Sequence, residues 1–198
     1  MEKVEVLRQY FGFSSFREGQ QTLIDAVLAG RDVLGVMPTG GGKSLCYELP
    51  ALLLPGLTLV ISPLISLMKD QVMALQNAGI PAGCIHSAMS VEELREAYRD
   101  TRFGAYKILY IAPERLLTDG FCALAQELEI SLLAVDEAHC ISQWGQDFRP
   151  SYLKIPEFVR TLPIRPVIGA FTATATREVR EDIIRMLELS DPCLLYTS

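Results

Sequence analysis

The sequence predicts an α/β domain built on an open, mostly parallel sheet with helices on both faces. Short apolar runs alternate with segments in which apolar residues recur every three or four positions. Most of the runs are rich in β-branched residues and are bounded by Gly, Pro or Asp. Continuous apolarity is typical of strands covered on both faces, and this alternation favours parallel strands joined by helical crossovers.

Five strands are expected, with a weaker sixth at Ala82–Ile85. The five are Val33–Met37, Leu57–Ile61, Lys107–Ile111, Leu132–Val135 and Pro166–Phe171. In such sheets ligands bind in the crevice at the carboxyl ends of the strands. The residues that follow each strand are therefore the first candidates for function.

Helices are expected between these strands, where apolar residues share one face. They are Gln20–Ala29, an apolar helix after Ser44, a helix from Pro63 to Gly79, one around Leu94–Tyr98, and Thr176–Leu187. Serine followed three residues later by glutamate predicts capping boxes at Ser15 and Ser90. Ser62 is expected to cap the helix that begins at Pro63.

Composition limits the classes of function. The chain has 198 residues, 49% hydrophobic and 21% charged, which is typical of a single globular domain spanning residues 1–198. Its net charge of −6 argues against coating of nucleic acid by bulk charge and leaves a local basic groove open. Five scattered cysteines without a C-x-x-C pair make a disulfide framework or a zinc site unexpected.

The location is expected to be cytoplasmic, or the nucleoid if the source is bacterial. The first ten residues contain charged side chains and no apolar core of a signal peptide. An uncharged stretch from Leu49 to Met68 is interrupted by prolines, so it is not expected to span a membrane.

A glycine-rich turn follows the first expected strand and precedes an apolar helix, with the sequence M-P-T-G-G-G-K-S at residues 37–44. Consecutive N–H groups in such a turn, together with a helix N-terminus, form a phosphate cradle. Lys43 is expected to reach the β- and γ-phosphates, and Ser44 to hold Mg²⁺. The candidate phosphate-binding residues are Thr39, Gly40, Gly41, Gly42, Lys43 and Ser44. The alternative is a glycine-rich turn with an incidental Lys-Ser pair.

A second motif, L-L-A-V-D-E-A-H at residues 132–139, places two carboxylates at the end of an apolar strand. Asp136 is expected to hold the hydration shell of Mg²⁺. Glu137 is expected to orient and deprotonate the attacking water. For His139, a structural role and a polar relay from the nucleotide to another surface both stay open.

These two motifs together resemble superfamily 2 nucleic-acid helicases, and further stretches resemble the RecQ family of DNA helicases. The stretches are F-G-F-S-S-F-R-E-G-Q (11–20), S-P-L-I-S-L-M-K-D-Q (62–71), I-A-P-E-R-L (111–116), C-I-S-Q-W-G-Q-D-F-R-P-S-Y (140–152) and T-A-T-A-T (172–176). The resemblance covers nearly the whole chain and implies a RecA-like P-loop NTPase domain, with N-terminal helices and an adenine-recognition motif within about residues 1–30.

The resemblance also assigns nucleotide contacts outside the phosphate loop. It implies that Phe13 stacks on adenine and that Arg17 and Gln20 contact the nucleotide. Family members often have Tyr where Phe13 stands, and Phe keeps the stacking face but lacks the hydroxyl. The alternative for Phe13 is a core aromatic.

A group of residues is implied to bind DNA or to couple it to ATP. Trp144 and Phe148 would stack on bases of single-stranded DNA, and Arg149 would neutralise a phosphate or sense the γ-phosphate. A base that pulls on Trp144 could move Glu137. The further implied phosphate-contacting and coupling residues are Ser62, Ser66, Lys69, Thr172 and Thr174. For Ser62 an ordinary helix cap is at least as compatible.

The expected function is that of the ATP-binding lobe of an ATP-dependent 3′–5′ DNA helicase in recombination and repair. ATP and Mg²⁺ are the expected cofactors, and single-stranded DNA or DNA with a single-stranded tail is the expected partner. A second lobe is expected in the full-length protein and not in these residues, so the isolated chain should bind ATP weakly, hydrolyse it slowly or not at all, and not unwind DNA. The alternatives are an RNA helicase of the D-E-A-H type and a catalytically incomplete nucleotide-dependent binding module.

Overall fold

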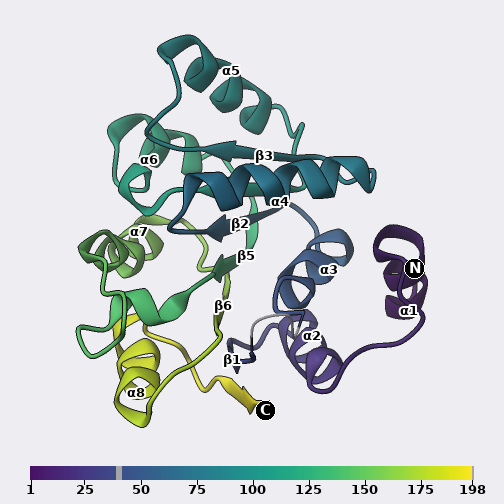
Figure 1. The fold of residues 1–198 in the computed structure, drawn as a ribbon. Coiled ribbons are helices and arrows are strands. Elements are labelled where there is room, and N and C mark those ends of the chain that lie inside the picture. Colours follow the sequence, from purple (N-terminus) through teal and green to yellow (C-terminus); the bar gives the residue numbers. More distant parts are fainter. Residues whose placement is uncertain (39–41, 198) are drawn as a thin grey trace.

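The structure, a computed structural model, describes residues 1–38 and 42–197 and contains one parallel sheet. Seven strands lie in the order β3-β4-β2-β5-β6-β1-β7, and every neighbouring pair is parallel (Figure 1). The strands are β1 Val33–Val36, β2 Leu57–Ile61, β3 Ala82–Ile85, β4 Ile108–Ile111, β5 Ile130–Val135, β6 Val167–Thr172 and β7 Cys193–Tyr196. The predicted open parallel sheet is confirmed.

Helices connect the strands as crossovers. They are α1 Lys3–Val6, α2 Gln20–Leu28, α3 Leu45–Leu53, α4 Ile65–Asn77, α5 Val91–Arg102, α6 Asp119–Ala125, α7 Lys154–Thr161 and α8 Arg177–Met186. Shorter helical turns are η1 Leu7–Phe11, η2 Pro113–Arg115, η3 Ala138–Ile141 and η4 Pro150–Leu153. The described helices include no segment long and apolar enough to cross a membrane.

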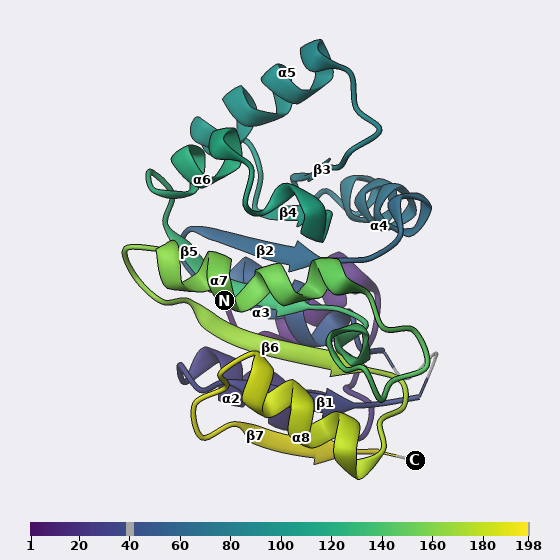
Figure 2. The ribbon, with the colours of Figure 1, turned by 90° about the vertical axis from the view of Figure 1, so that its left-hand side faces the viewer.

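The sheet is covered on both faces, as its continuous apolar strands require (Figure 2). Side chains from α5, α6, α7 and α8 join one buried cluster, which contains Phe121 and Phe158. Side chains from α2, α3 and α4 join a second cluster on the opposite face, which contains Tyr47 and Phe171. Every residue of β2 is buried, so the strand's unbroken apolar sequence follows from its central position.

Capping predictions met different outcomes. Ser90 forms the predicted capping box at the start of α5, and Thr176 caps α8. The capping box at Ser15 is wrong, because α2 begins after Gly19, which has φ +82°. The cap at Ser62 is also wrong, because the Ser62 N–H continues the β-ladder to the Ile111 carbonyl and α4 begins after an extended Leu64.

Strand order brings three separate segments to one edge of the sheet. β6 lies between β1 and β5, so the turns that follow these three strands are neighbours at the carboxyl edge. The turn after β1 carries the glycine-rich motif, the turn after β5 carries Asp136 and Glu137, and the turn after β6 carries Thr174. The fold therefore gathers motifs that are far apart in the sequence.

At the opposite edge of the sheet, where the strands begin, Asp32 links neighbouring segments. Its side chain is only 2% exposed. Its carboxylate accepts two hydrogen bonds from the Arg165 guanidinium, at 3.1 and 2.6 Å. It also accepts the backbone N–H groups of Ile168 and Ser190, at 3.0 and 2.7 Å. These bonds connect the starts of β1 and β6 with the segment that leads into β7.

Candidate functional site

A cavity of about 500 Å³ opens at the carboxyl edge of the sheet. Eight predicted nucleotide, metal or chemistry residues line it: Phe13, Arg17, Gln20, Gly42, Lys43, Ser44, Asp136 and Glu137. We call it the strand-edge cavity. Its walls come from the segment before α2, from the turn and helix after β1, from α4, and from the end of β5. The predicted residues Thr39, Gly40 and Gly41 lie outside the described residues.

Gln20 joins the segment before α2 to the glycine-rich turn. Its amide Nε2 donates to the Gly42 carbonyl at 3.1 Å, and its Oε1 accepts the Arg17 N–H at 2.7 Å. Gly42 has φ +78°, and a Cβ there would lie 2.1 Å from the Gln20 Nε2. The turn therefore requires glycine at this position, both for its backbone conformation and for the close approach of Gln20.

Phe13 is 51% exposed and lines the strand-edge cavity. This position is unlike that of the core aromatics, such as Phe121 and Phe158, which are fully buried. The alternative interpretation of Phe13 as a core aromatic is therefore wrong. An exposed ring on a cavity wall offers a flat apolar face to a planar group.

Asp136 provides a poorly neutralised carboxylate in this cavity. Its backbone N–H extends the ladder to the Ile61 carbonyl, and its Oδ1 accepts the Glu137 N–H at 3.0 Å. Burial, and secondarily the neighbouring charge of Glu137, raises the pKa of Asp136 to about 6. Together with the Ser44 hydroxyl, a desolvated carboxylate of this kind fits a hard cation such as Mg²⁺.

Glu137 joins the two motifs. Its Oε1 lies 3.5 Å from the Lys43 Nζ, and its Oε2 lies 3.5 Å from the His139 Nδ1. The backbone of Glu137 has φ +50°, a left-handed conformation that is uncommon for a residue with a side chain. Strain of this kind is often held at functional sites.

The contacts continue from His139 toward the end of β6. The His139 Nδ1 lies 2.7 Å from the Thr172 Oγ1, and the Thr172 hydroxyl donates to the Thr174 carbonyl at 3.2 Å. These contacts form a continuous polar path from Lys43 to the turn after β6. Both roles considered for His139 use such contacts, so the relay stays a prediction.

Tyr47, Glu48 and Tyr110 form a buried group that the sequence analysis missed. Glu48 is 6% exposed and lines the strand-edge cavity, and the Tyr110 hydroxyl donates to its Oε1 at 3.3 Å. Burial raises the pKa of Glu48 to about 7. Glu48 stands four residues after Ser44, and this helical spacing was the available signal.

A second cavity, of about 260 Å³, lies beside the loop of residues 142–148. We call these the Trp144 cavity and the Trp144 loop. The cavity is lined by His139, Trp144, Gly145, Gln146, Thr174, Ala175, Thr176 and Val179. Trp144 is 75% exposed, so its ring does not cap the core.

Three other residues that were predicted to contact DNA are less exposed than Trp144. Phe148 and Arg149 are partly buried and do not line the Trp144 cavity. Arg149 donates to the Asp147 carboxylate at 3.1 Å. Ser62 is 1% exposed, and its hydroxyl has no hydrogen-bond partner in the part of the chain that the structure describes. A direct contact between Ser62 and DNA would therefore need the surrounding segment to move.

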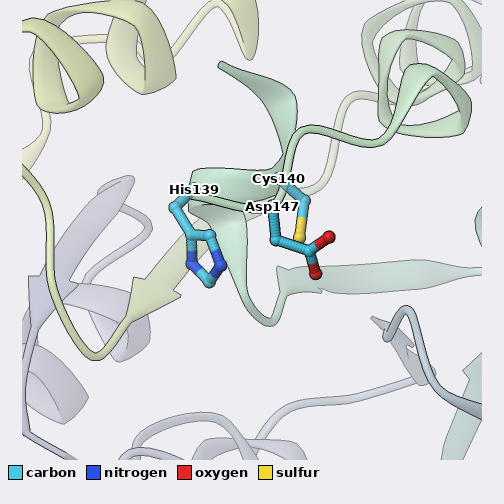
Figure 3. Close-up of side chains that lie close together, drawn as sticks. All are labelled: His139, Cys140 and Asp147. Carbon is cyan, nitrogen blue, oxygen red and sulfur yellow. The ribbon is translucent and has the colours of Figure 1, made fainter. Parts of the chain in front are cut away.

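His139, Cys140 and Asp147 converge beside this loop (Figure 3), with one potential ligand atom of each lying within 4.8 Å of the others. Arg149 already neutralises Asp147 through two contacts of 3.1 Å. Burial raises the pKa of the Cys140 thiol to about 12, which keeps it protonated. The carboxylate of this group is therefore paired with Arg149, and its thiol is protonated.

The parallel sheet, with its cavity at the carboxyl edge, places the chain in the class of RecA-like α/β domains. The DEAD/DEAH box helicase family model matches residues 17–182. The chain belongs to that family.

Two similar relatives are named RecQ. The chain is 51% identical to the ATP-dependent DNA helicase RecQ of Bacillus subtilis over 97% of its own length and 33% of that protein. It is 48% identical to the RecQ protein of Pasteurella multocida over 96% of its own length and 30% of that protein. The chain thus spans about a third of the length of these relatives.

Among solved structures, the fold is similar to that of a hypothetical ATP-dependent RNA helicase from Sulfolobus tokodaii. The TM-score is 0.77 with 22% sequence identity, and the match covers 98% of this chain and 56% of the other. At this identity the likeness supports the fold alone.

Proposed function

We propose that this chain is the ATP-binding lobe of an ATP-dependent DNA helicase that moves 3′ to 5′ along single-stranded DNA and acts in recombination and repair. One observation carries the proposal. Eight residues from three distant segments line the strand-edge cavity, and Lys43 and Glu137 form an ion pair across it. The RecQ names of the two relatives support the choice of a DNA helicase.

The cavity residues divide the chemistry of ATP hydrolysis among them. Lys43 would exchange its contact with Glu137 for the β- and γ-phosphates, because a triphosphate carries more negative charge than one carboxylate. Glu137, freed from Lys43, would orient and deprotonate the attacking water. Phe13 would stack on adenine, while Arg17 and Gln20 would fix its position against the phosphate turn.

Ser44 and Asp136 are the residues that would hold Mg²⁺. When bound, Mg²⁺ supplies neutralisation of the charge on the transferred phosphoryl group. The raised pKa of Asp136 supports this assignment, because a cation beside the carboxylate would relieve the cost of its desolvation.

The DNA side of the proposal rests on the Trp144 loop. An exposed indole beside a cavity provides a stacking surface for an unpaired base. The polar path from Glu137 through His139 to Thr172 would carry movement between this loop and the site of hydrolysis. Phe148, Arg149, Ser62 and Thr174 would assist in binding or coupling.

Helicases of this superfamily work with two lobes, so we propose that a second lobe completes the ATP site with an arginine. Such an arginine contributes about 10³–10⁵ in rate in comparable phosphoryl-transfer enzymes. The proposed location is the cytoplasm, at the nucleoid if the source is bacterial. Strand displacement by this 198-residue chain alone would contradict the need for a second lobe.

A catalytically incomplete binding module remains the second candidate, because the arginine expected from a second lobe has no equivalent assigned in the described site. Glu137→Gln separates the two candidates, with ATP turnover measured in the presence of single-stranded DNA. We expect ATP binding to persist and turnover to fall by about 10²–10⁴, the usual contribution of a general base. Equal turnover in the variant and the parent chain would contradict the proposed role of Glu137.

A further inference from the structure

The Trp144 loop is joined to α8 by a hydrogen bond between two side chains that the function described above does not use. The Ser142 hydroxyl donates to the Asp182 Oδ2 at 2.8 Å. The same Ser142 Oγ accepts the backbone N–H of Trp144 at 3.1 Å. One hydroxyl therefore connects the backbone of the exposed tryptophan to the middle of a helix.

The surroundings of this bond make it a strong one. Ser142 is completely buried, and the Asp182 side chain is only 16% exposed. The second oxygen of Asp182 accepts from the Nη2 of the exposed Arg185 side chain at 2.8 Å, and the Ser142 hydrogen bond lowers the pKa of Asp182 more than Arg185 does. Hydrogen bonds to ionised acceptors are about twice as strong as neutral ones, and screening by water is weak at a buried hydroxyl.

Other contacts restrain the loop on both sides of Trp144, and the Gly145 N–H donates to the Ser142 carbonyl at 3.1 Å. The loop is closed at its base by the Arg149 N–H, which donates to the Cys140 carbonyl at 2.8 Å. Gly145 packs so closely that a Cβ there would lie 2.7 Å from the His139 carbonyl. The indole itself is exposed, so its direction depends on the backbone at Trp144.

The bond also sets one wall of the Trp144 cavity. Trp144 and Gln146 line one side, while Thr176 and Val179 of the α8 start line the other. Asp182 lies one turn further along the same helix than Val179. A loop held to α8 at this point keeps the two walls at a fixed separation.

We propose that Asp182 is a positioning residue that, through Ser142, holds the Trp144 loop against α8 and keeps the Trp144 cavity ready for an unpaired base. The DNA part of this inference rests on the proposed function, whereas the structural part does not. Preorganisation of this kind lowers the entropy cost of binding.

The test uses the only tryptophan among the 198 residues as its probe. Asp182→Ala removes the acceptor, and Asp182→Asn keeps an acceptor oxygen. Arg185→Ala is the matched control, because it removes the neighbouring exposed ion pair and leaves the Ser142 bond in place. Ser142→Ala provides a second way to break the bond from the loop side.

In Asp182→Ala we expect hydrogen exchange at the Trp144 amide to accelerate about tenfold, with a larger fast component in the fluorescence anisotropy decay of Trp144. Ser142→Ala should act in the same direction, whereas Asp182→Asn should lie close to the parent chain. Unchanged exchange and anisotropy in Asp182→Ala, or an equal change in Arg185→Ala, would overturn the proposal.

Binding of a single-stranded oligothymidylate separates this inference from the proposed function. We expect Asp182→Ala to weaken that binding about fivefold, and Asp182→Asn to restore most of it. A freed tryptophan with unchanged oligothymidylate affinity would support the positioning role of Asp182. The same result would contradict the proposed role of the Trp144 loop in DNA binding.

Discussion

Two aspartates, at opposite edges of the sheet, have different roles. Asp32, at the amino edge, is 2% exposed and accepts hydrogen bonds from Arg165 and from two backbone N–H groups. Asp136, at the carboxyl edge, accepts the adjacent Glu137 N–H, and burial raises its pKa to about 6. The fold therefore supplies the Asp32 carboxylate with several hydrogen-bond donors, whereas the Asp136 carboxylate is desolvated and would be stabilised by a cation.

The difference indicates that the amino edge of the sheet contributes to stability and that the carboxyl edge provides a binding site. A buried carboxylate with all its acceptors used holds segments together. A desolvated carboxylate beside Lys43 and Ser44 lowers stability and provides a place for a ligand. A desolvated carboxylate with a raised pKa therefore marks the functional edge of the sheet more clearly than burial alone does.

The largest expected effect is a loss of stability in Asp32→Ala. The substitution leaves the Arg165 guanidinium and two backbone N–H groups without their acceptor, and it disconnects the starts of β1 and β6. Breaking a buried ion pair by removing one partner typically lowers stability by about 3–5 kcal/mol. We take the lower part of that range, because the Arg165 side chain is 42% exposed. Urea unfolding followed by circular dichroism measures the change.

Asp191→Ala is the matched control for Asp32→Ala. The Asp191 side chain is 97% exposed, and its carboxylate lies 4.0 Å from the Arg31 guanidinium, so loss of this carboxylate should change stability by less than about 0.5 kcal/mol. An equal loss of stability in the two variants would contradict the distinction between a buried, hydrogen-bonded carboxylate and an exposed one.

The next effect is a gain in stability in Asp136→Asn, with a defined pH dependence. The ordinary pKa of 3.8 is raised to about 6 in the folded chain, so between these values the folded state holds a proton that the unfolded chain releases. The ionised carboxylate thus lowers the free energy of unfolding as pH rises through this window. Without Mg²⁺, we expect the variant to be about 1–2 kcal/mol more stable above pH 6. Near pH 4 the difference should vanish.

Thermal unfolding in EDTA at a series of pH values measures this difference. A variant less stable than the parent chain at high pH would show that Asp136 is satisfied by the fold, as Asp32 is.

A smaller effect is expected at Glu137, whose backbone has φ +50°. Glycine adopts this conformation without steric cost, so relief of strain in Glu137→Gly should raise stability by about 0.5–1 kcal/mol. Glu137→Gln keeps the strain while it removes the charge, and it serves as the control. If calorimetric melting temperatures of the two variants coincide, the left-handed backbone carries no strain.

Much of the fold followed from the sequence because apolar runs identify buried strands directly. Leu57–Ile61 and Ala82–Ile85 were predicted with their observed bounds. The sequence analysis missed β7, Cys193–Tyr196, an edge strand whose residues alternate between partly buried and exposed positions. The predicted caps at Ser15 and Ser62 failed where longer-range hydrogen bonds, from Gln20 to Gly42 and from Ser62 to Ile111, hold the nearby backbone.

The residues lining the strand-edge cavity were largely predictable because the glycine-rich turn and the Asp-Glu pair follow strands of one sheet. Glu48 was missed, since its importance depends on contact with Tyr110, which lies 62 residues away in sequence. The bond between Ser142 and Asp182 was equally hidden, because it joins a loop to a helix 40 residues later. Apart from the four-residue spacing between Ser44 and Glu48, these two tertiary pairs leave no local pattern in the sequence.

The most direct test of the central claim is calorimetric titration of the chain with a non-hydrolysable ATP analogue, with Mg²⁺ and with EDTA. If the Asp136 carboxylate holds Mg²⁺, then Mg²⁺ should tighten binding of the ATP analogue by about tenfold or more in the parent chain. In Asp136→Asn the effect of Mg²⁺ should be largely lost. An equal effect of Mg²⁺ on both proteins would contradict the claim that this carboxylate is held ready for a cation.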